Sequence, residues 1–166
     1  MTRKSEPPNR NSVSPKKEPR GASRRIPISW RNLGQCEHFS VDHDVFHKIL
    51  RVTRISDEYP DTTELRSAHN WLLRLFKGFD RTKVVLVWDG RRGKLRNDPA
   101  FEQAMKEVLP PVTEAWREFI SINNTPVMKV QFFRWTREGI ACPIRAFNDE
   151  GEALDFAVGA SLGGRS

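Results

Sequence analysis

Apolar residues along the chain follow two spacings, one typical of strands and the other of helices. The run Lys83–Trp88 is continuous, apolar and rich in β-branched residues, which predicts a strand buried on both faces of a sheet. Weaker strand patterns cover Cys36–Val41 and Ile140–Ala146. Strands that alternate with helices predict an α/β fold, with a mostly parallel central sheet flanked by helices.

Two helices carry clear start signals. Apolar residues between Leu65 and Phe79 share one face, and Asp61 precedes them as an N-cap. Asp98 caps the second helix, which has Pro99 in its first turn. We expect Pro110-Pro111 to end that helix, because proline cannot donate the backbone hydrogen bond.

The remaining apolar patterns are shorter. Helices are predicted over Val45–Val52, Thr113–Ile120 and Asp149–Leu162. The segment from Thr125 to Gly139 fits either a helix or, through its VMKVQFF stretch, a strand. Trp71, Trp88 and Trp116 fall within apolar patterns, so we expect them in the core.

Charge divides the 166 residues into two unequal parts. Of the net charge of +7, residues 1–25 supply +6 and also contain four prolines and few apolar residues. This composition predicts a disordered tail, followed by one α/β domain over residues 26–166. A basic arm for nucleic acid and a solubilising or targeting tail both fit the composition, and the alternatives stay open.

Targeting signals are weak. The longest apolar run, Val84–Trp88, is far too short to cross a bilayer, and the polar N-terminus does not resemble a signal peptide. Cys36 and Cys142 are the two cysteines, too few for a disulfide framework. These features predict a protein that is not secreted and resides in the cytoplasm or wherever its nucleic acid is found.

Carboxylates follow three of the strand candidates. They are Asp42 (with Asp44), Asp89, and the pair Glu150 and Glu152 beside Asp149. In a parallel sheet these strand ends meet at one edge, where converging carboxylates favour a bound cation. Mg²⁺ or Mn²⁺ suits such an oxygen site and polarises a phosphate for hydrolysis. Taken singly, each acid also fits an ordinary turn or the first turn of a helix.

The order of these segments resembles the 5′-nucleases of the flap-endonuclease type, which have a PIN-like fold. The similar segments are Val41–Lys48, Thr62–Gly90, Arg91–Lys106 in the place of the basic helical arch, and Gly139–Ala153. They correspond to the N-terminal half of that family, in a divergent and shortened form, because its later aspartate-bearing strand is not matched before Ser166.

The resemblance implies a divalent-metal-dependent nuclease. Its metal-binding carboxylates would be Asp42, Asp89, Glu150 and Glu152. Its nucleic-acid contacts would be Arg91, Arg92, Lys94, Arg96 and Lys106, with Arg96 acting on the scissile phosphate. The implied cofactor is Mg²⁺ or Mn²⁺, and the implied partner is nucleic acid, with DNA favoured over RNA.

Three alternatives remain. The chain also fits a non-enzymatic nucleic-acid-binding protein of the viral nucleocapsid or packaging type, whose 1–25 arm dominates affinity. In a third possible function, the fold is retained for protein–protein contacts only. A zinc site from Cys36, His38, His43 and His47 has less support, because no paired-cysteine spacing accompanies it.

Overall fold

The computed structural model describes residues 26–94, 96, 98–127, 130, 134 and 144–163. The predicted disordered tail, residues 1–25, lies outside this part of the chain. The described strands are β1 (Arg31–Gln35), β2 (Phe39–Asp44), β3 (Ile49–Arg54), β4 (Val85–Asp89), β5 (Glu118–Ile122) and β6 (Ile144–Phe147). The helices are α1 (Thr62–Phe76), α2 (Pro99–Thr113) and α4 (Glu150–Ser161), with a short 3-10 turn at Arg81–Lys83.

The strands form one sheet in the order in which they occur in the chain, β1 to β6. The pairs β1–β2 and β2–β3 are antiparallel, whereas β3–β4, β4–β5 and β5–β6 are parallel. The α/β class is therefore confirmed, but the prediction of a mostly parallel sheet holds only for its second half. The first half is a meander, because short turns can join only antiparallel neighbours.

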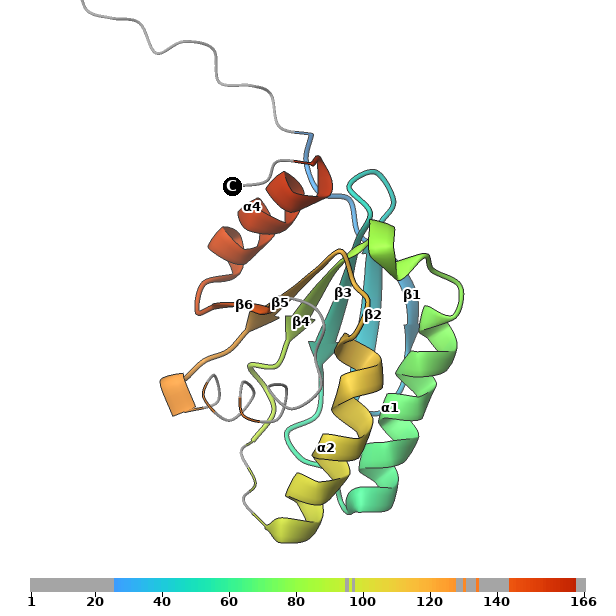
Figure 1. Cartoon of the computed structure of the whole chain (residues 1–166), viewed down its shortest axis with the longest axis vertical. Helices are drawn as coiled ribbons and strands as arrows, with labels where there is room; N and C mark the ends of the chain where they lie inside the picture. The colour runs from blue at the N-terminus through green and yellow to red at the C-terminus, as the bar shows by residue number, and fades with distance from the viewer. Residues whose placement is uncertain are drawn as a thin grey trace, which may run out of the picture.

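Helices cover both faces of this sheet, and two cores result (Figure 1). The larger core lies under α1 and α2, which pack side by side and bury residues such as Leu65, Leu72 and Leu109. The smaller core lies under α4 and includes Ile49, Val85 and the helix residues Ala153 and Ala157. Strand β4 is buried along its whole length, as the sequence predicted for Lys83–Trp88.

Several helix predictions are confirmed at their start signals. Asp61 caps α1, its carboxylate accepting hydrogen bonds from the backbone N–H of Thr63 and Glu64, both at 2.8 Å. Asp98 caps α2 through the N–H of Phe101 at 2.9 Å. Asp149 caps α4, which matches the helix predicted there. The predicted core tryptophans Trp88 and Trp116 are buried, and Trp71 is half-buried against the larger core.

The helix predicted over Val45–Val52 is wrong. Residues from Ile49 form strand β3, which turns back on β2 through a tight hairpin. Leu50 and Val52 face the larger core while Ile49 faces the smaller one. A strand buried on both faces carries apolar residues at several spacings, which produced the helical pattern.

The helix predicted over Thr113–Ile120 is also wrong. Helix α2 continues past Pro110-Pro111 to Thr113, whose hydroxyl donates to the carbonyl oxygen of Leu109 at 3.0 Å. The following apolar residues then form strand β5. Each proline removes one backbone hydrogen bond, but the helix continues because its apolar face remains buried through Leu109 and Val112. The segment 125–139 lies mostly outside the described residues, whereas the strand predicted at Ile140–Ala146 overlaps β6.

No helix in the described part of the chain is long and apolar enough to span a membrane.

Candidate functional site

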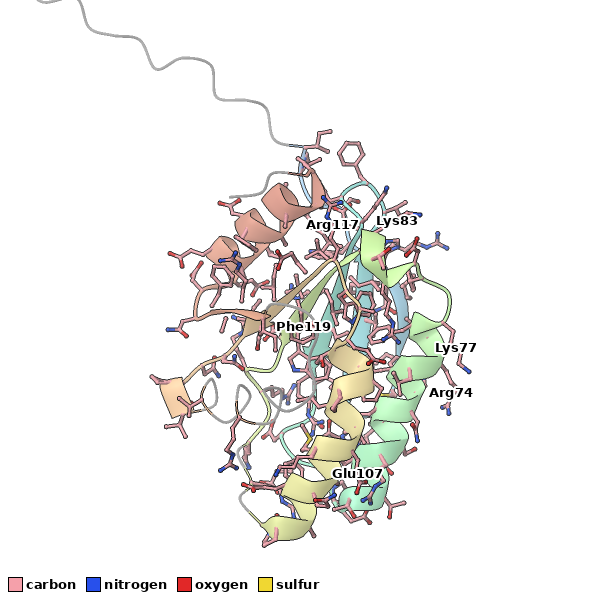
Figure 2. All side chains as sticks on the ribbon, viewed as in Figure 1. Arg74, Lys77, Lys83, Glu107, Arg117 and Phe119 are labelled. Carbon is pink, nitrogen blue, oxygen red and sulfur yellow. The ribbon has the colours of Figure 1, made fainter. Side chains whose placement is uncertain are left out.

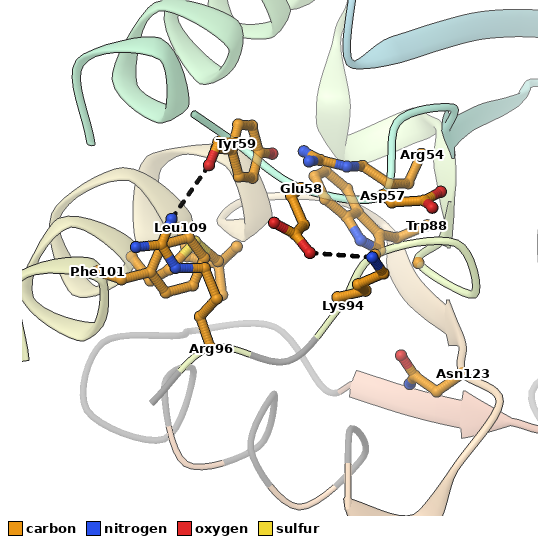
Figure 3. A pocket seen from close by; sticks show the side chains of 13 residues that line it. Arg54, Asp57, Glu58, Tyr59, Trp88, Lys94, Arg96, Phe101, Leu109 and Asn123 are labelled. Atoms are coloured by element: carbon orange, nitrogen blue, oxygen red, sulfur yellow. Dashed lines mark hydrogen bonds and ion pairs between the residues drawn. The ribbon is translucent and has the colours of Figure 1, made fainter. Parts of the chain in front are cut away.

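A cavity opens at the carboxyl ends of strands β3 and β4, next to helix α2 (Figure 3). Ligands of α/β proteins bind beyond the carboxyl ends of parallel strands, so its position is typical of a binding site. Its lining residues are Arg54, Asp57, Glu58, Tyr59, Trp88, Gly90, Gly93, Lys94, Arg96, Phe101, Met105, Leu109 and Asn123.

One wall of the cavity is apolar. Phe101, Met105 and Leu109 stand at every fourth position of α2 and so share a face of that helix. Trp88 contributes its ring from the end of β4, and Tyr59 comes from the loop after β3. This wall offers an apolar body a flat aromatic surface to pack against.

Arg54, the last residue of β3, is the most unusual group in the lining. Only 6% of it is exposed, and its Cζ lies 3.5 Å from the centre of the Tyr59 ring. Its Nε donates to the carbonyl oxygen of Ser56 at 2.8 Å. Its Nη1 is buried with no hydrogen-bond partner among the described residues. Burial lowers the pKa of Arg54, although the guanidinium remains charged.

The remaining charges stand around the opening in pairs. Lys94 Nζ lies 3.0 Å from Glu58 Oε1, and Arg92 Nε lies 3.0 Å from Asp57 Oδ1. Arg96 Nε donates to Asp98 at 2.9 Å, and its Nη1 donates to the carbonyl oxygen of Tyr59 at 3.1 Å. The two acids of the lining are thus already engaged by cations.

Backbone hydrogen bonds hold the loop that carries Lys94. The N–H of Gly93 donates to the carbonyl oxygen of Gly90 at 3.1 Å, and the N–H of Lys94 donates to that of Asp57 at 2.8 Å. A Cβ on Gly90 would lie 3.3 Å from the indole nitrogen of Trp88, so a small residue fits best there.

Burial raises the pKa of Tyr59 well above its usual value, so its phenol stays protonated.

The carboxylates predicted from the sequence meet only in part. Asp89 and Glu150 come together beyond the end of β4, with two arginines between them. Arg51 lies 2.8 Å from Asp89 and 2.7 Å from Glu150, and Arg91 lies 2.6 Å from each. Burial alone would raise the pKa of Asp89, but hydrogen bonds from Arg91 and Arg51 outweigh it and lower that pKa. Guanidinium groups thus stand where the sequence led us to expect a metal ion.

Asp42 and Glu152 are placed differently. Strand β2 runs antiparallel to β3, so its carboxyl end lies away from the edge at which β3 and β4 end. Asp42 is paired with Arg51, in the middle of β3. Its carboxylate accepts a hydrogen bond from Asn32 at 2.9 Å. Glu152 is exposed in the first turn of α4. A Mg²⁺ or Mn²⁺ ion on these four carboxylates stays a prediction, and it would require Arg51 and Arg91 to move aside.

The cations predicted to contact phosphate stand in different surroundings. Arg91 is held by Asp89 and Glu150, and Arg92 by Asp57. Lys94 and Arg96 line the cavity, and Lys106 is exposed on α2. Nucleic acid as a partner of these side chains stays a prediction.

The sequence analysis missed Arg51, Arg54 and Tyr59. Arg51 stands within the segment that we predicted as a helix, and Arg54 follows that segment by two residues. The strand that places them on opposite faces was therefore not recognised. Tyr59 lies in the loop between β3 and α1, where an aromatic ring is easily taken for an exposed one. A basic residue at the end of an apolar strand is the signal that points to Arg54.

Two solved structures match the chain at low sequence identity. No protein-family model and no curated protein matches the chain. One matching crystal structure is described as an uncharacterized DUF3478-family protein with a SpoIIAA-like fold from Shewanella loihica. It is 13% identical over 82% of this chain and 99% of its own, with a TM-score of 0.47. Apo-SiaC from Pseudomonas aeruginosa is 20% identical over 72% and 98% of the two chains, with a TM-score of 0.41.

The resemblance to flap-endonuclease-type nucleases is therefore wrong, as are the PIN-like fold and the nuclease function drawn from it. Neither matching structure is described as a nuclease. In this chain, a second strand takes the place of the helix expected after Asp42, and β2 is antiparallel to β3. The order of weak motifs suggested a topology that the sheet does not have.

Proposed function

We propose that this protein is a binding module for a small anionic ligand with a flat apolar body, such as an aromatic carboxylate. The observation that carries this proposal is Arg54, a buried guanidinium beside an apolar cavity, with one nitrogen that lacks a hydrogen-bond partner among the described residues. A buried charge is costly unless an opposite charge compensates it. An anion in the cavity supplies that compensation.

The other groups of the lining favour an anion over a cation. Asp57 and Glu58 are engaged by Arg92 and Lys94, so their charge is already balanced. Lys94 and Arg96 are themselves paired with Glu58 and Asp98, so the charge of Arg54 leaves the lining positive. A cationic ligand would have to displace one of these cations from its carboxylate. An anion can approach Arg54 without breaking any of these ion pairs.

The walls and size of the cavity indicate the body of the ligand. The rings of Trp88, Phe101 and Tyr59 present flat apolar surface, and Asn123 offers an amide at the far side (Figure 3). The cavity volume is about 90 Å³, which suits a single ring or side chain. The apolar contacts supply affinity, and the few polar groups orient the ligand.

Benzoate and benzamide test the proposal, because they share a ring and differ in charge. Titrations followed by amide NMR of the full chain should show benzoate binding at least fivefold more tightly than benzamide. Coulomb attraction of about 1–2 kcal/mol in a medium of intermediate dielectric gives this preference. The shifts should centre on residues 88–94 and on α2. Equal affinity for the two probes would contradict the proposal, as would shifts located elsewhere.

Two variants localise the anion. Arg54→Gln should weaken benzoate binding about tenfold and leave benzamide unchanged, because it removes charge but not the apolar wall. Lys94→Gln, at an exposed position, should weaken benzoate less. Lys77→Gln is the matched control, since Lys77 projects outward at the end of α1 (Figure 2). Benzoate affinity that is the same in all three variants would exclude this cavity as the site.

A further inference from the structure

A second site is indicated by the turn between β1 and β2, where His38 lies close to two glutamates. Glu37 and His38 are in this turn, and Glu64 is in the first turn of α1. One ligand atom from each lies within 4.8 Å of the others. Each backbone is fixed: the N–H of Ile55 donates to the carbonyl oxygen of His38 at 3.0 Å, and Asp61 caps the helix that carries Glu64.

Hydrogen bonding defines which nitrogen of His38 carries the proton. The hydroxyl of Ser56 donates to the carbonyl oxygen of Glu58 at 3.3 Å, so its oxygen is left to accept. That oxygen lies 2.6 Å from Nδ1 of His38, which therefore acts as the donor. In the neutral form of the ring with this tautomer, Nε2 presents a lone pair. This arrangement, with one ring nitrogen fixed by a hydrogen bond and the other free to bind, is typical of metal-ligating histidines.

The free nitrogen is buried and directed at a carboxylate. His38 is 1% exposed, and its Nε2 makes no hydrogen bond with any described group. It nevertheless lies 3.3 Å from Oε1 of Glu64. A positive charge between these two electron-rich atoms, from a proton or a metal ion, relieves their repulsion.

The separation matches the geometry of zinc. Zinc bonds of about 2.0–2.2 Å arranged tetrahedrally place two ligand atoms about 3.4 Å apart. Glu37 is exposed, so its side chain is free to turn towards the same point. A neutral imidazole and two carboxylates leave a fourth position for water. The ligand set carries a charge of −2, which a dication balances.

We propose that Glu37, His38 and Glu64 bind a divalent transition-metal ion, with Zn²⁺ the best fit. This set differs from the zinc ligands considered from the sequence, of which only His38 is retained. His47 is paired with Asp44 at 3.0 Å, and the ring of His43 packs against Phe79. Imidazole favours Zn²⁺ over Mg²⁺ or Ca²⁺, which take oxygen ligands. The site adjoins the cavity, because the rings of His38 and Tyr59 lie 4.7 Å apart, but the proposal does not rest on the binding function proposed above.

Calorimetric titration of the metal-stripped full chain with Zn²⁺ tests the proposal, with Mg²⁺ as a comparison. We expect one Zn²⁺ per chain with micromolar or tighter affinity, and no measurable binding of Mg²⁺. Glu37→Gln and Glu64→Gln should each weaken binding at least tenfold. Glu37→Gln carries most weight, because this side chain is exposed and its replacement leaves the fold intact.

Two further variants serve as controls. Glu114→Gln changes an exposed glutamate elsewhere, and His43→Gln removes a ligand of the alternative set, so neither should change the affinity. Nitrogen NMR of the imidazoles gives an independent readout: Zn²⁺ should shift Nε2 of His38 and leave its Nδ1–H in place. The proposal is overturned if the wild type binds no Zn²⁺, if His43→Gln abolishes binding, or if both glutamate variants bind like the wild type. The contact between His38 and Glu64 would then be a simple ion pair.

Discussion

His69 in helix α1 is a titratable side chain enclosed by aromatic rings. It is 1% exposed, and the rings of Phe39 and Trp88 lie 5.4 and 6.1 Å from its own. Its Nδ1–H donates to the carbonyl oxygen of Leu65 at 2.8 Å, and Nε2 has no hydrogen-bond partner among the described residues. Burial lowers the pKa of His69 to about 4. The folded protein therefore holds this imidazole neutral well below the pH at which an exposed histidine gains a proton.

This burial predicts a loss of stability in mild acid. Between pH 6.5 and about 4 the unfolded chain binds a proton at His69 that the folded chain does not. The free energy of unfolding therefore falls as the pH falls through this window, by about 3 kcal/mol for this group. Urea unfolding at several pH values from 7 to 4 measures the decrease.

The variant His69→Phe isolates the contribution of this group, because it keeps a ring of similar size and removes the titration. Other groups titrate equally in both proteins, so the pH profile of the variant should be flatter by about the same 3 kcal/mol. Identical losses in the two proteins would show that His69 takes up its proton in the folded state as well.

At the scale of elements, the hairpin between β2 and β3 decides which face each residue of β3 occupies. Lys48 closes this turn with a positive φ of 53°, a backbone conformation that glycine adopts without strain. Its carbonyl oxygen also accepts a hydrogen bond from the N–H of Val85 at 3.0 Å, which links the turn to β4. The turn thus sets the register that brings Arg51 beside Asp89 and Arg54 beside the cavity.

We expect Lys48→Gly to stabilise the protein by about 0.5 kcal/mol. Relief of the left-handed strain is worth about 1 kcal/mol or more, and part of it is offset by the greater freedom of glycine in the unfolded chain. Lys48→Val should instead destabilise, because a β-branched residue fits this conformation poorly. Denaturation midpoints compare the three proteins. A loss of stability on glycine substitution would show that the Lys48 side chain contributes more than its backbone strain costs.

The same hairpin shows why the sequence predicted some elements and not others. Asp61, Asp98 and Asp149 are local signals, since a cap bonds the helix that directly follows it, and those helices were predicted correctly. Strand β3 has no such signal. Its apolar residues face two different cores, so the strand can be recognised only from its pairing with β2 and β4.

The candidate site was predictable to a similar extent. The basic segment that holds Lys94 and Arg96 and the strand that ends at Asp89 were recognised from local patterns. Arg51 and Arg54 were not, because their contacts involve groups far away in the chain, such as Glu150 for Arg51. His38 was considered only with Cys36, His43 and His47, because its contact with Glu64 also joins distant parts of the chain. The direction of β2 could not be predicted from its own residues either. Because β2 is antiparallel to β3, Asp42 lies away from the edge at which the carboxylates were expected to converge.

At the scale of the whole molecule, the sheet divides the core unequally. Helices α1 and α2 bury five and seven residues, including large side chains such as Leu72 and Phe101. Helix α4 buries only Ala153 and Ala157 fully, with Leu154, Phe156 and Val158 partly covered. Its first turn is additionally tied to the sheet, because Glu150 pairs with Arg51 and Arg91. Helix α4 therefore buries less apolar surface than α1 and α2, so its separation from the sheet costs less free energy.

We expect α4 to open locally before the rest of the molecule unfolds. Native-state hydrogen exchange should give the amides of α4 an opening free energy at least about 2 kcal/mol below that of β4, which is buried along its whole length. Val112→Ala provides the decisive comparison. It removes two methyl groups from the larger core, on the face of the sheet opposite α4, which costs about 1–2 kcal/mol. If α4 opens on its own, the larger core stays folded in the opened state, so the variant lowers the opening free energy of β4 and leaves that of α4 unchanged. If α4 opens only with the whole domain, the variant lowers the opening free energy of both elements equally, and the unequal division of the core has no consequence for cooperativity.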